Sequence, residues 1–386
     1  MKKNPSTSVS NKIFITIPWF LPAFRAGGPV QSIANLVKEY REGVEYLIYC
    51  GDTDLNGAEL ENIKTNEWVS FNAYTKVWYA RTEKRSETLL KLVEEEKPGI
   101  LFIIGLFSWH FNIVPMVFCN GPRKILSSRG MLHPGALSQK KLKKRGYLQL
   151  FKMLGYDDKV DFHATDTEEA DYIHSYFGKQ VKVFVAGNFP TKVGLLPFPF
   201  KEPGKLKLVS VAIISPVKNT LLILEALAKV KEWIEYDIYG PINDEEYWDL
   251  CKEQIKRLPE NIQVTYHREI EPSRVKEVLE EAHVFILPSK SENFGHALYE
   301  ALSAGRPVIT SYHTPWKELL ESVAGFNVSV SDTAGIDTGI RFFAQMNQEE
   351  MQKWSRGALA YAEKKLDVGK VREEYREMFE VVGGKL

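Results

Sequence analysis

Two glutamates, Glu292 and Glu300, lie eight residues apart in a segment whose residue types suit the binding of a sugar and a phosphate. An apolar run at 283–287 precedes them and a short helical pattern follows, so the order is strand, glycine-containing loop and helix. Ligands bind at this edge of a parallel α/β sheet. Free backbone N–H groups around Phe294 and Gly295, with the positive end of the helix dipole, favour a phosphate. At Glu300, in the first turns of the helix, a carboxylate can accept hydrogen bonds from sugar hydroxyls.

The elements that would position these residues are visible as a repeated pattern. Short β-branched runs alternate with longer amphipathic stretches along the chain. This alternation predicts an α/β fold with parallel sheets and helices on both faces. The predicted strands are 13–17, 46–49, 76–79, 100–104, 124–127 and 161–164 in the first half, and 206–211, 236–239, 262–266, 284–287, 307–310 and 325–328 in the second.

Length and one irregular stretch predict the domain organisation. A chain of 386 residues exceeds one ordinary core, so two domains are expected. The stretch 187–204 is rich in proline and glycine and has no helical period, which favours a linker. The predicted parts are a Rossmann-like domain over 1–190, a linker over 191–204, a second Rossmann-like domain over 205–367 and an amphipathic helix over 368–386.

Composition excludes several classes of function. The chain is 44% hydrophobic and 26% charged, as soluble globular proteins are, and its 50 basic residues balance 50 acidic ones, so no global field favours nucleic acid. Three distant cysteines lack metal-ligand spacing and indicate reduced thiols in the cytoplasm. No apolar stretch approaches the ~20 residues of a membrane span. The first eleven residues read as a disordered tip, not a signal peptide.

The residues around the two glutamates carry a family resemblance. Pro288-Ser289, Phe294-Gly295, Ala301-Leu302 and Gly305-Arg306-Pro307 flank them. The whole segment resembles the signature of the retaining glycosyltransferases of family 4. That family has the GT-B fold, in which two Rossmann-like domains face a cleft and the C-terminal helix crosses back to the first domain. The resemblance therefore implies that the helix over 368–386 packs on the N-terminal domain.

The resemblance also implies roles for residues of the second domain. Glu292 would lie beside the donor sugar and Glu300 would bind the ribose of a sugar nucleotide. The segment Asn293-Phe294-Gly295 would contact the sugar and the phosphates. Lys218 would neutralise the diphosphate, but the family typically has an arginine five residues earlier, where this chain has Ile213. One cation in place of two weakens charge stabilisation in the transition state unless another group compensates.

Two segments of the first domain complete the predicted site. Gly27 and Gly28 follow the first strand, and because neither has a Cβ a ligand can approach the backbone closely. Their position resembles the family loop that faces the diphosphate and the acceptor. Arg129 follows the strand at 124–127, near the place where the family often has a histidine, and can bind a phosphate or an acidic sugar. His133 either substitutes for that histidine or caps a turn.

The resemblance implies transfer of a sugar from a UDP-, GDP- or ADP-linked donor to a saccharide or lipid-linked acceptor hydroxyl, with retention at the anomeric carbon. Such a retaining hexosyltransferase needs neither an obligatory metal nor a cofactor, and similarity suggests surface polysaccharide synthesis. Asp52-Thr53-Asp54 is interpreted as a loop without a metal. Two alternatives stay open. One is a GT-B sugar-nucleotide epimerase. The other is a catalytically inactive sugar-nucleotide-binding protein, because Ile213 stands where the family typically has an arginine.

One basic segment lies outside the predicted site. Lys140–Arg145 holds five cations within six residues beside aliphatic and aromatic positions. The pattern predicts a basic amphipathic helix that either rests on anionic lipid or forms an ordinary solvated face. Nucleic acid is a third interpretation, which the lack of any other basic motif disfavours. The expected location is the cytoplasm, with peripheral contact at the inner face of the cell membrane if the lipid interpretation holds.

Overall fold

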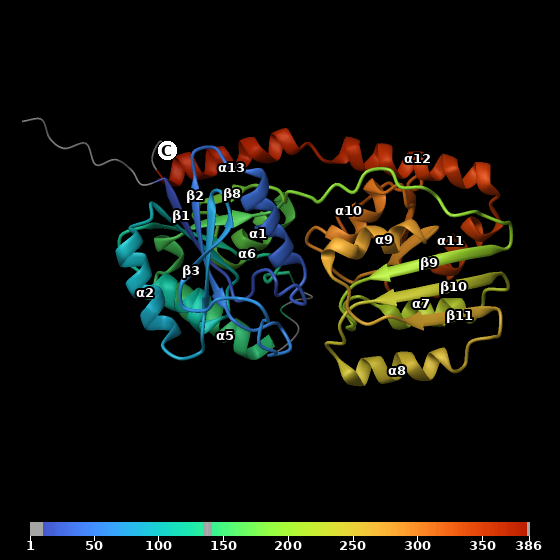
Figure 1. Cartoon of the computed structure of the whole chain (residues 1–386), viewed down its shortest axis with the longest axis horizontal. Helices are drawn as coiled ribbons and strands as arrows, with labels where there is room; N and C mark the ends of the chain where they lie inside the picture. Colours follow the sequence, from blue (N-terminus) through green and yellow to red (C-terminus); the bar gives the residue numbers. More distant parts are fainter. Residues whose placement is uncertain (1–10, 134–136, 138–140, 384–386) are drawn as a thin grey trace, which may run out of the picture. The chain divides into compact units, whose positions relative to one another are not determined.

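The computed structural model describes residues 11–133, 137 and 141–383. The predicted N-terminal tip and Lys140 therefore lie outside the described residues, apart from Asn11. The chain forms two units, one of 1–189 with 368–386 and one of 190–367. Each unit contains one sheet with helices packed on it (Figure 1). Among the described helices, none has the length and apolar character needed to span a bilayer.

The sheet of the first unit has eight strands in the order β3-β4-β2-β1-β5-β6-β7-β8. All neighbouring strands are parallel except β3 and β4. The six strands predicted in this half are present, and β3 and β8 are additional. The bounds are β1 Lys12–Thr16, β2 Glu45–Gly51, β3 Trp68–Asn72, β4 Thr75–Ala80, β5 Ile100–Ile104, β6 Arg123–Ser127, β7 Asp161–Ala164 and β8 Val183–Val185.

The described helical segments of the first unit connect these strands, apart from the C-terminal helix α13. They are α1 Gly28–Glu39, α2 Arg85–Glu96, the π-helix η1 Trp109–Ile113, α3 Val114–Phe118, α5 Lys141–Met153, the 3-10 turn η2 Asp157–Lys159, α6 Thr167–Phe177 and α13 Val368–Gly383. Pro29 lies at the start of α1, where its fixed φ suits a helix and its missing N–H costs nothing.

The C-terminal helix α13 is part of the first unit, as predicted. Its apolar face is buried in the core of that unit through Val371, Tyr375, Met378, Phe379 and Val382. The Tyr375 ring stacks on Phe189 at 5.5 Å and an interplanar angle of 23°. An amphipathic helix at the end of the chain therefore completes the core of the domain in which the chain begins.

The sheet of the second unit has six parallel strands in the order β11-β10-β9-β12-β13-β14. Every residue of β12 is buried, which explains why its sequence is a continuous apolar run. All six predicted strands are present. Their bounds are β9 Lys205–Val211, β10 Trp233–Tyr239, β11 Ile262–Tyr266, β12 Val284–Leu287, β13 Val308–Ser311 and β14 Gly325–Val328.

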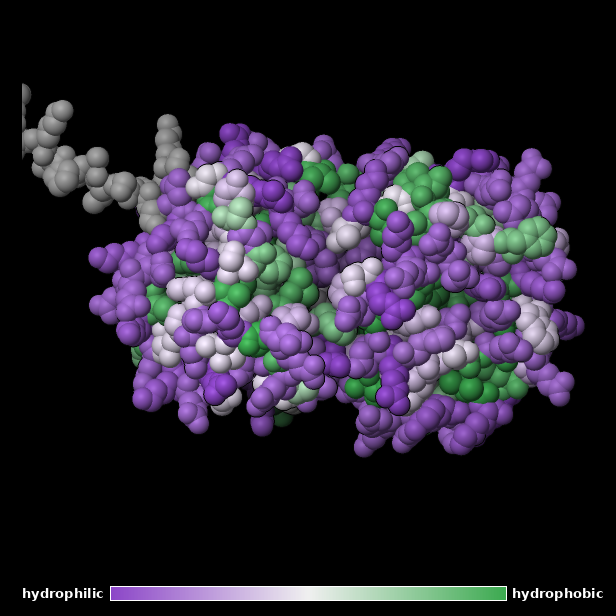
Figure 2. Space-filling view, viewed as in Figure 1, coloured by the Kyte–Doolittle hydropathy of each residue, from purple (hydrophilic) through white to green (hydrophobic). Residues whose placement is uncertain are grey.

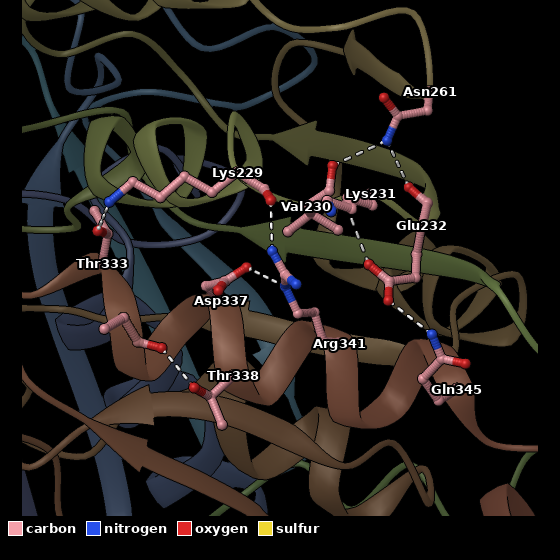
Figure 3. A network of polar contacts seen from close by, with 11 residues as sticks. Lys229, Val230, Lys231, Glu232, Asn261, Thr333, Asp337, Thr338, Arg341 and Gln345 are labelled. Carbon is pink, nitrogen blue, oxygen red and sulfur yellow. Dashed lines mark hydrogen bonds and ion pairs between the residues drawn. The ribbon is translucent and has the colours of Figure 1, made fainter.

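In the second unit, polar side chains tie one helix, α11, to the turn between α7 and β10 (Figure 3). In the turn between α7 and β10, Lys229 donates to Thr333 at 2.8 Å, and its carbonyl accepts from Arg341. The helical segments are α7 Thr220–Leu227, α8 Glu245–Ile255, the 3-10 turn η3 Pro272–Arg274, α9 Val275–Glu280, α10 His296–Ser303, α11 Thr333–Gln345 and α12 Gln348–Lys365.

The segment 191–204, predicted as a linker, is extended but packs on the second unit. The side chain of Arg306, which is fully buried, donates to the Pro197 carbonyl and lies over the Phe198 ring. Lys201, also buried, donates to the Ala344 and Met346 carbonyls at 2.8 Å each. These contacts make the segment part of the second unit, and the unit boundary falls between Phe189 and Pro190.

Candidate active site

The structure brings Lys218 and Glu292 together in the second unit. Lys218 lies in the loop between β9 and α7, and Glu292 in the loop between β12 and α10. Because β9 and β12 are neighbouring parallel strands, both loops leave the same edge of the sheet. The Nζ atom of Lys218 is 2.5 Å from Oε1 of Glu292. The two side chains are 22% and 10% exposed, so this pair is largely shielded from bulk water.

The backbone around this pair is fixed by further hydrogen bonds. The Lys290 N–H donates to the Val217 carbonyl at 2.8 Å, which joins the two loops directly. The Ser289 hydroxyl donates to Oε1 of Glu292 at 2.8 Å. The Glu292 N–H donates to the His313 carbonyl at 3.2 Å, in the loop that follows β13. Loops from three strand ends therefore hold the Glu292 carboxylate in one place.

The start of α10 presents two unused backbone donors. Gly295 precedes the helix with φ 75 and ψ 63, a left-handed conformation that glycine adopts without steric cost. Among the described residues, no acceptor is bound to the N–H groups of Phe294 and Gly295. The Trp316 indole donates to the Phe294 carbonyl at 2.7 Å and so orients this peptide. Such N–H groups at a helix start form a site suited to an anion.

Glu300 lies on α10, four residues beyond its first residue His296. Burial raises the pKa of its carboxyl group to about 8. None of the described residues makes a hydrogen bond or an ion pair with this carboxyl group. A carboxyl group that is desolvated without a partner is destabilised as an anion, and ligand hydroxyl groups can remove that cost by donating to it.

The second cation that the family resemblance implies beside Lys218 is replaced by Ile213. Ile213 is half-buried in the segment that follows β9. The backbone there lies close to Gly240, the residue that follows β10. A Cβ at Gly240 would lie only 1.8 Å from the Ala212 carbonyl oxygen, so the approach requires glycine. The backbone carbonyl of Arg268 accepts from the Gly240 N–H at 2.7 Å, and the Arg268 side chain is exposed. The structure gives no contact between Arg268 and Lys218 or Glu292.

In the first unit, Gly27 and Gly28 lie between β1 and α1. Gly27 has φ 73, and no atom lies within 4 Å of the position that a Cβ would take at Gly28. The backbone is therefore open to close approach at this point. Arg25, two residues earlier, pairs with Asp54 at 3.2 Å. Its guanidinium group thus has a carboxylate partner within the unit.

Arg129 follows β6, at the same edge of the first sheet as the glycine loop. It has φ 47, which is uncommon for a residue with a side chain, and it is 9% exposed. Its Nη1 atom donates to Oδ1 of Asn188 at 2.8 Å. Its Nε and Nη2 atoms are buried without a hydrogen-bond acceptor among the described residues. The buried Tyr375 hydroxyl also faces this guanidinium group, which acts to lower the pKa of that hydroxyl although burial raises it overall. The remaining donors of the guanidinium group suit an anionic oxygen.

The conformation around Arg129 depends on Glu169, which sequence reasoning did not single out. Oε1 of Glu169 accepts from the Ser128 hydroxyl at 2.6 Å and from the Gly130 N–H at 2.5 Å. Oε2 accepts from the N–H and hydroxyl groups of Thr165 at 2.8 and 2.9 Å. Burial raises the pKa of this carboxyl group, but these hydrogen bonds outweigh burial and lower it overall. Glu169 thus holds both residues that flank Arg129.

The two histidines of this region differ in environment. His133 is half-buried in the turn after Arg129, and its ring meets Tyr172 edge-on at 5.3 Å. His163 is fully buried between the Ser127 hydroxyl at 2.8 Å and the Ala186 carbonyl at 2.9 Å. Burial and the nearby Arg129 lower the pKa of His163 to about 3. His163 is therefore a neutral structural residue.

The carboxylates of the Asp52-Thr53-Asp54 segment are used within the fold. Asp52 pairs with Arg85 at 2.8 Å, and Asp54 pairs with Arg25. Within the described ranges, no cluster of three or more His, Cys, Asp and Glu side chains is placed to hold a metal ion. The prediction that the protein works without a metal or a cofactor stays a prediction.

Comparisons with known proteins identify the fold. Residues 197–360 match the family model described as glycosyl transferases group 1. The whole chain resembles sucrose-phosphate synthase of Thermosynechococcus elongatus, with 16% identity and a TM-score of 0.69 over 96% of this chain and 99% of that one. It also resembles HepE of Anabaena in complex with UDP-glucose, with 15% identity and a TM-score of 0.70 over the same shares. The fold is GT-B.

A relative with higher identity is the Escherichia coli (strain K12) protein named "Putative colanic acid biosynthesis glycosyltransferase WcaL". The identity is 30% over 170 residues, which is 40% of this chain and 40% of that protein. The chain thus matches less than half of the length of this relative. The range that the family model matches, residues 197–360, includes Lys218, Glu292 and Glu300.

Proposed function

We propose that the protein is a retaining glycosyltransferase of family 4 that moves a sugar from a nucleotide-diphosphate donor to an acceptor hydroxyl. The observation that carries the proposal is the Lys218–Glu292 pair beside the open start of α10. This arrangement offers a cation, two free backbone N–H groups and two carboxyl groups at one sheet edge. It matches a ligand that combines a diphosphate with a sugar and a ribose.

Each part of the donor then has a partner in the second unit. Lys218 and the N–H groups of Phe294 and Gly295 neutralise charge on the diphosphate as the nucleotide leaves. Glu292 accepts hydrogen bonds from the donor sugar, and Asn293 lies beside it. Glu300 accepts from the ribose hydroxyls, which supplies the partners that its buried carboxyl group lacks.

The first unit is proposed to supply anion contacts and the acceptor side. Arg129 offers its unused N–H groups to a phosphate or an acidic sugar, and His133 follows in the adjacent turn. The open backbone at Gly27 and Gly28 admits the diphosphate or the acceptor. These roles rest on the geometry within the unit and on the family resemblance.

The comparisons support a nucleotide-sugar donor and a role in polysaccharide synthesis. The Anabaena neighbour has been solved with UDP-glucose, and the name of the Escherichia coli relative refers to colanic acid biosynthesis. We therefore propose a UDP-linked donor as the first to test, with GDP- and ADP-linked sugars as comparisons. The proposed acceptor is a saccharide or a lipid-linked saccharide of a surface polysaccharide.

The proposal is tested by measuring nucleotide release from UDP-, GDP- and ADP-glucose with and without a pool of saccharide acceptors. We expect one donor to give acceptor-dependent release, and nuclear magnetic resonance of the product to show the anomeric configuration of the donor. An inverted product would remove the retaining mechanism. Release of an epimerised sugar nucleotide without transfer would favour the epimerase.

The inactive binding protein is tested at position 213. If Ile213 leaves transition-state charge poorly neutralised, Ile213→Arg should raise the transfer rate and change nucleotide affinity less. Intact nucleotide binding with no transfer in either the wild type or the variant would favour the binding protein. The matched control is Leu250→Arg, which adds the same charge at an exposed position on α8 of the same unit.

A further inference from the structure

Helix α5 has two apolar faces, of which only one is used by the fold. On the inner face, Leu148 and Phe151 are 5% and 2% exposed and belong to the core of the first unit. On the outer face, Leu142, Leu150 and Met153 are 88%, 48% and 77% exposed. Leu154, directly after the helix, is 51% exposed. Large side chains of this kind seldom gather on a solvent-facing helix surface without a partner.

The outer apolar side chains form a stripe. At 100° per residue, Leu142, Gly146, Leu150 and Met153 are spaced by four, four and three positions and so share one side of the helix. Gly146 between them is exposed and has no side chain, which leaves the helix surface accessible along the stripe. We call Leu142, Gly146, Leu150 and Met153 the outer stripe.

Basic residues border the outer stripe. Arg145 and Lys152, one heptad apart, lie along one side, and Lys143 lies on the other, and all three are exposed. The helix contains five basic residues and no acidic residue, and the sequence has no Asp or Glu from 124 to 156. The chain as a whole has a formal net charge of +0, so this is a local concentration of positive charge.

We propose that this face of α5 docks on the surface of an anionic phospholipid bilayer. The outer stripe enters the boundary between headgroups and acyl chains, and the long stems of Arg145, Lys152 and Lys143 extend to the lipid phosphates. The free energies of apolar burial and of headgroup attraction add, and each cation near an anionic surface contributes its own share to the free energy of membrane binding. Charge complementarity favours anionic lipid over a second copy of this chain, because two copies of α5 would bring like charges together.

The experiment is co-sedimentation of the full chain with phosphatidylcholine vesicles and with vesicles that also contain phosphatidylglycerol. We expect binding to the anionic vesicles only, and weaker binding as salt rises. The variant Leu142→Ser/Met153→Ser removes the exposed ends of the stripe, and Lys143→Glu/Arg145→Glu reverses its border. Each is expected to lower the partition coefficient by about tenfold or more.

Matched controls lie in the second unit. Leu250→Ser changes a leucine that is 57% exposed on α8, and Lys364→Glu reverses an exposed lysine on α12. Both should bind vesicles as the wild type does, and circular dichroism should show that every variant is folded. The proposal is overturned if the wild type ignores anionic vesicles at low salt, or if the α5 variants bind like the controls. Self-association in analytical ultracentrifugation that the α5 variants abolish, without lipid binding, would assign the stripe to a second copy instead.

Discussion

Nζ of Lys218 and Oε1 of Glu292 lie 2.5 Å apart although 74 residues separate them in the sequence. Their contact follows from topology, because β9 and β12 pair in parallel and their C-terminal loops leave one sheet edge. Glu292 thus pairs with the cation that we assign to the donor diphosphate. Our assignment implies that this ion pair shifts when the donor binds, so that Lys218 turns to phosphate while Glu292 turns to the sugar.

Replacing Lys218 tests this exchange. Lys218→Ala removes the cation that faces the leaving diphosphate, and we expect the transfer rate to fall by about 10²–10³-fold. Lys218→Arg keeps the charge and should recover part of the rate. The control Lys229→Ala removes a lysine of the same domain whose Nζ bonds to Thr333. Steady-state kinetics with the preferred donor make the comparison, and equal rates for Lys218→Ala and the control would contradict the assignment.

The pH dependence of nucleotide binding tests Glu300. Burial raises the pKa of its carboxyl group to about 8, so the group is mostly protonated in the free protein at pH 7 and ionises as the pH rises. The ionised form accepts hydrogen bonds from both ribose hydroxyls more strongly than the neutral form does. Nucleotide affinity should therefore increase by up to about tenfold between about pH 7 and pH 9. Calorimetric titration measures it, and Glu300→Gln should bind weakly with a flat profile.

The same pKa makes a prediction about stability. An unfolded glutamate ionises near its ordinary pKa, about 4.3, whereas folded Glu300 ionises only near 8. The folded state therefore loses relative stability as the pH rises from about 4.5 to 8, because the unfolded chain releases the proton more readily. Glu300→Gln removes this loss. Its melting temperature should exceed that of the wild type by about 2–4 °C or more at pH 8, and by less at pH 5.

The control for that comparison is Glu321→Gln, an exposed glutamate of the same unit. It should change the melting temperature similarly and only slightly at both pH values. A Glu300→Gln variant that is no more stable than the wild type at pH 8 would contradict a desolvated carboxyl group at this position.

Glu169 is predicted to be the main support of the Arg129 turn. Glu169→Gln replaces one carboxylate oxygen by an NH₂ group that faces hydrogen-bond donors, so we expect a loss of roughly 2–4 kcal/mol in the free energy of unfolding. Urea denaturation measures this loss. The neighbouring variant Glu168→Gln alters only an exposed carboxylate that accepts from Tyr172 at 2.8 Å. It should lose less than about 1 kcal/mol, and an equal loss in both variants would remove the special role of Glu169.

The pH sign for Glu169 is opposite to that for Glu300. Its hydrogen bonds lower the pKa below the ordinary value, so its stabilisation is present above about pH 4.3 and disappears as the pH falls through the lower folded pKa. The stability difference between wild type and Glu169→Gln should therefore shrink on acidification. A difference that stays constant from neutral pH to about pH 3 would contradict this account.

The strands that sequence predicted are those with a strong local signal. All residues of β5 and β12 are buried, and a continuous apolar run identifies such strands. The strand β3 was missed because it is an antiparallel edge strand, in which no residue is fully buried. The strand β8 has only three residues, Val183–Val185, too few to show a period.

The candidate site could be proposed from sequence where it is local and not where it is assembled by packing. The loop and helix around Glu292 and Glu300 are contiguous, so this segment could be matched to the family signature that it resembles. The role of Glu169 depends on donors from the 128–130 turn, about forty residues away in the chain, which no local pattern reveals. The stretch 191–204 has linker composition, yet buried Arg306 and Lys201 fix it to the second unit.

The exposed apolar residues of α5 could not be identified from composition alone. Figure 2 shows a visible face on which hydrophilic residues predominate and hydrophobic ones are interspersed. The basic segment predicted an amphipathic helix that either rests on anionic lipid or forms an ordinary solvated face. The structure instead shows apolar residues on both sides of α5, because Leu148 and Phe151 satisfy the core and leave Leu142 and Met153 outside.

The measurement that tests the central claim most directly is thermal-shift titration of the wild type and Glu300→Ala with UDP, GDP, ADP and their sugar conjugates. A ligand that binds only the folded state at a concentration 100 times its Kd adds about 2.7 kcal/mol of stability. We predict a concentration-dependent rise in melting temperature with one nucleotide, which Glu300→Ala loses while remaining folded. No rise with any nucleotide at millimolar concentration would contradict a nucleotide-sugar site at Lys218, Glu292 and Glu300.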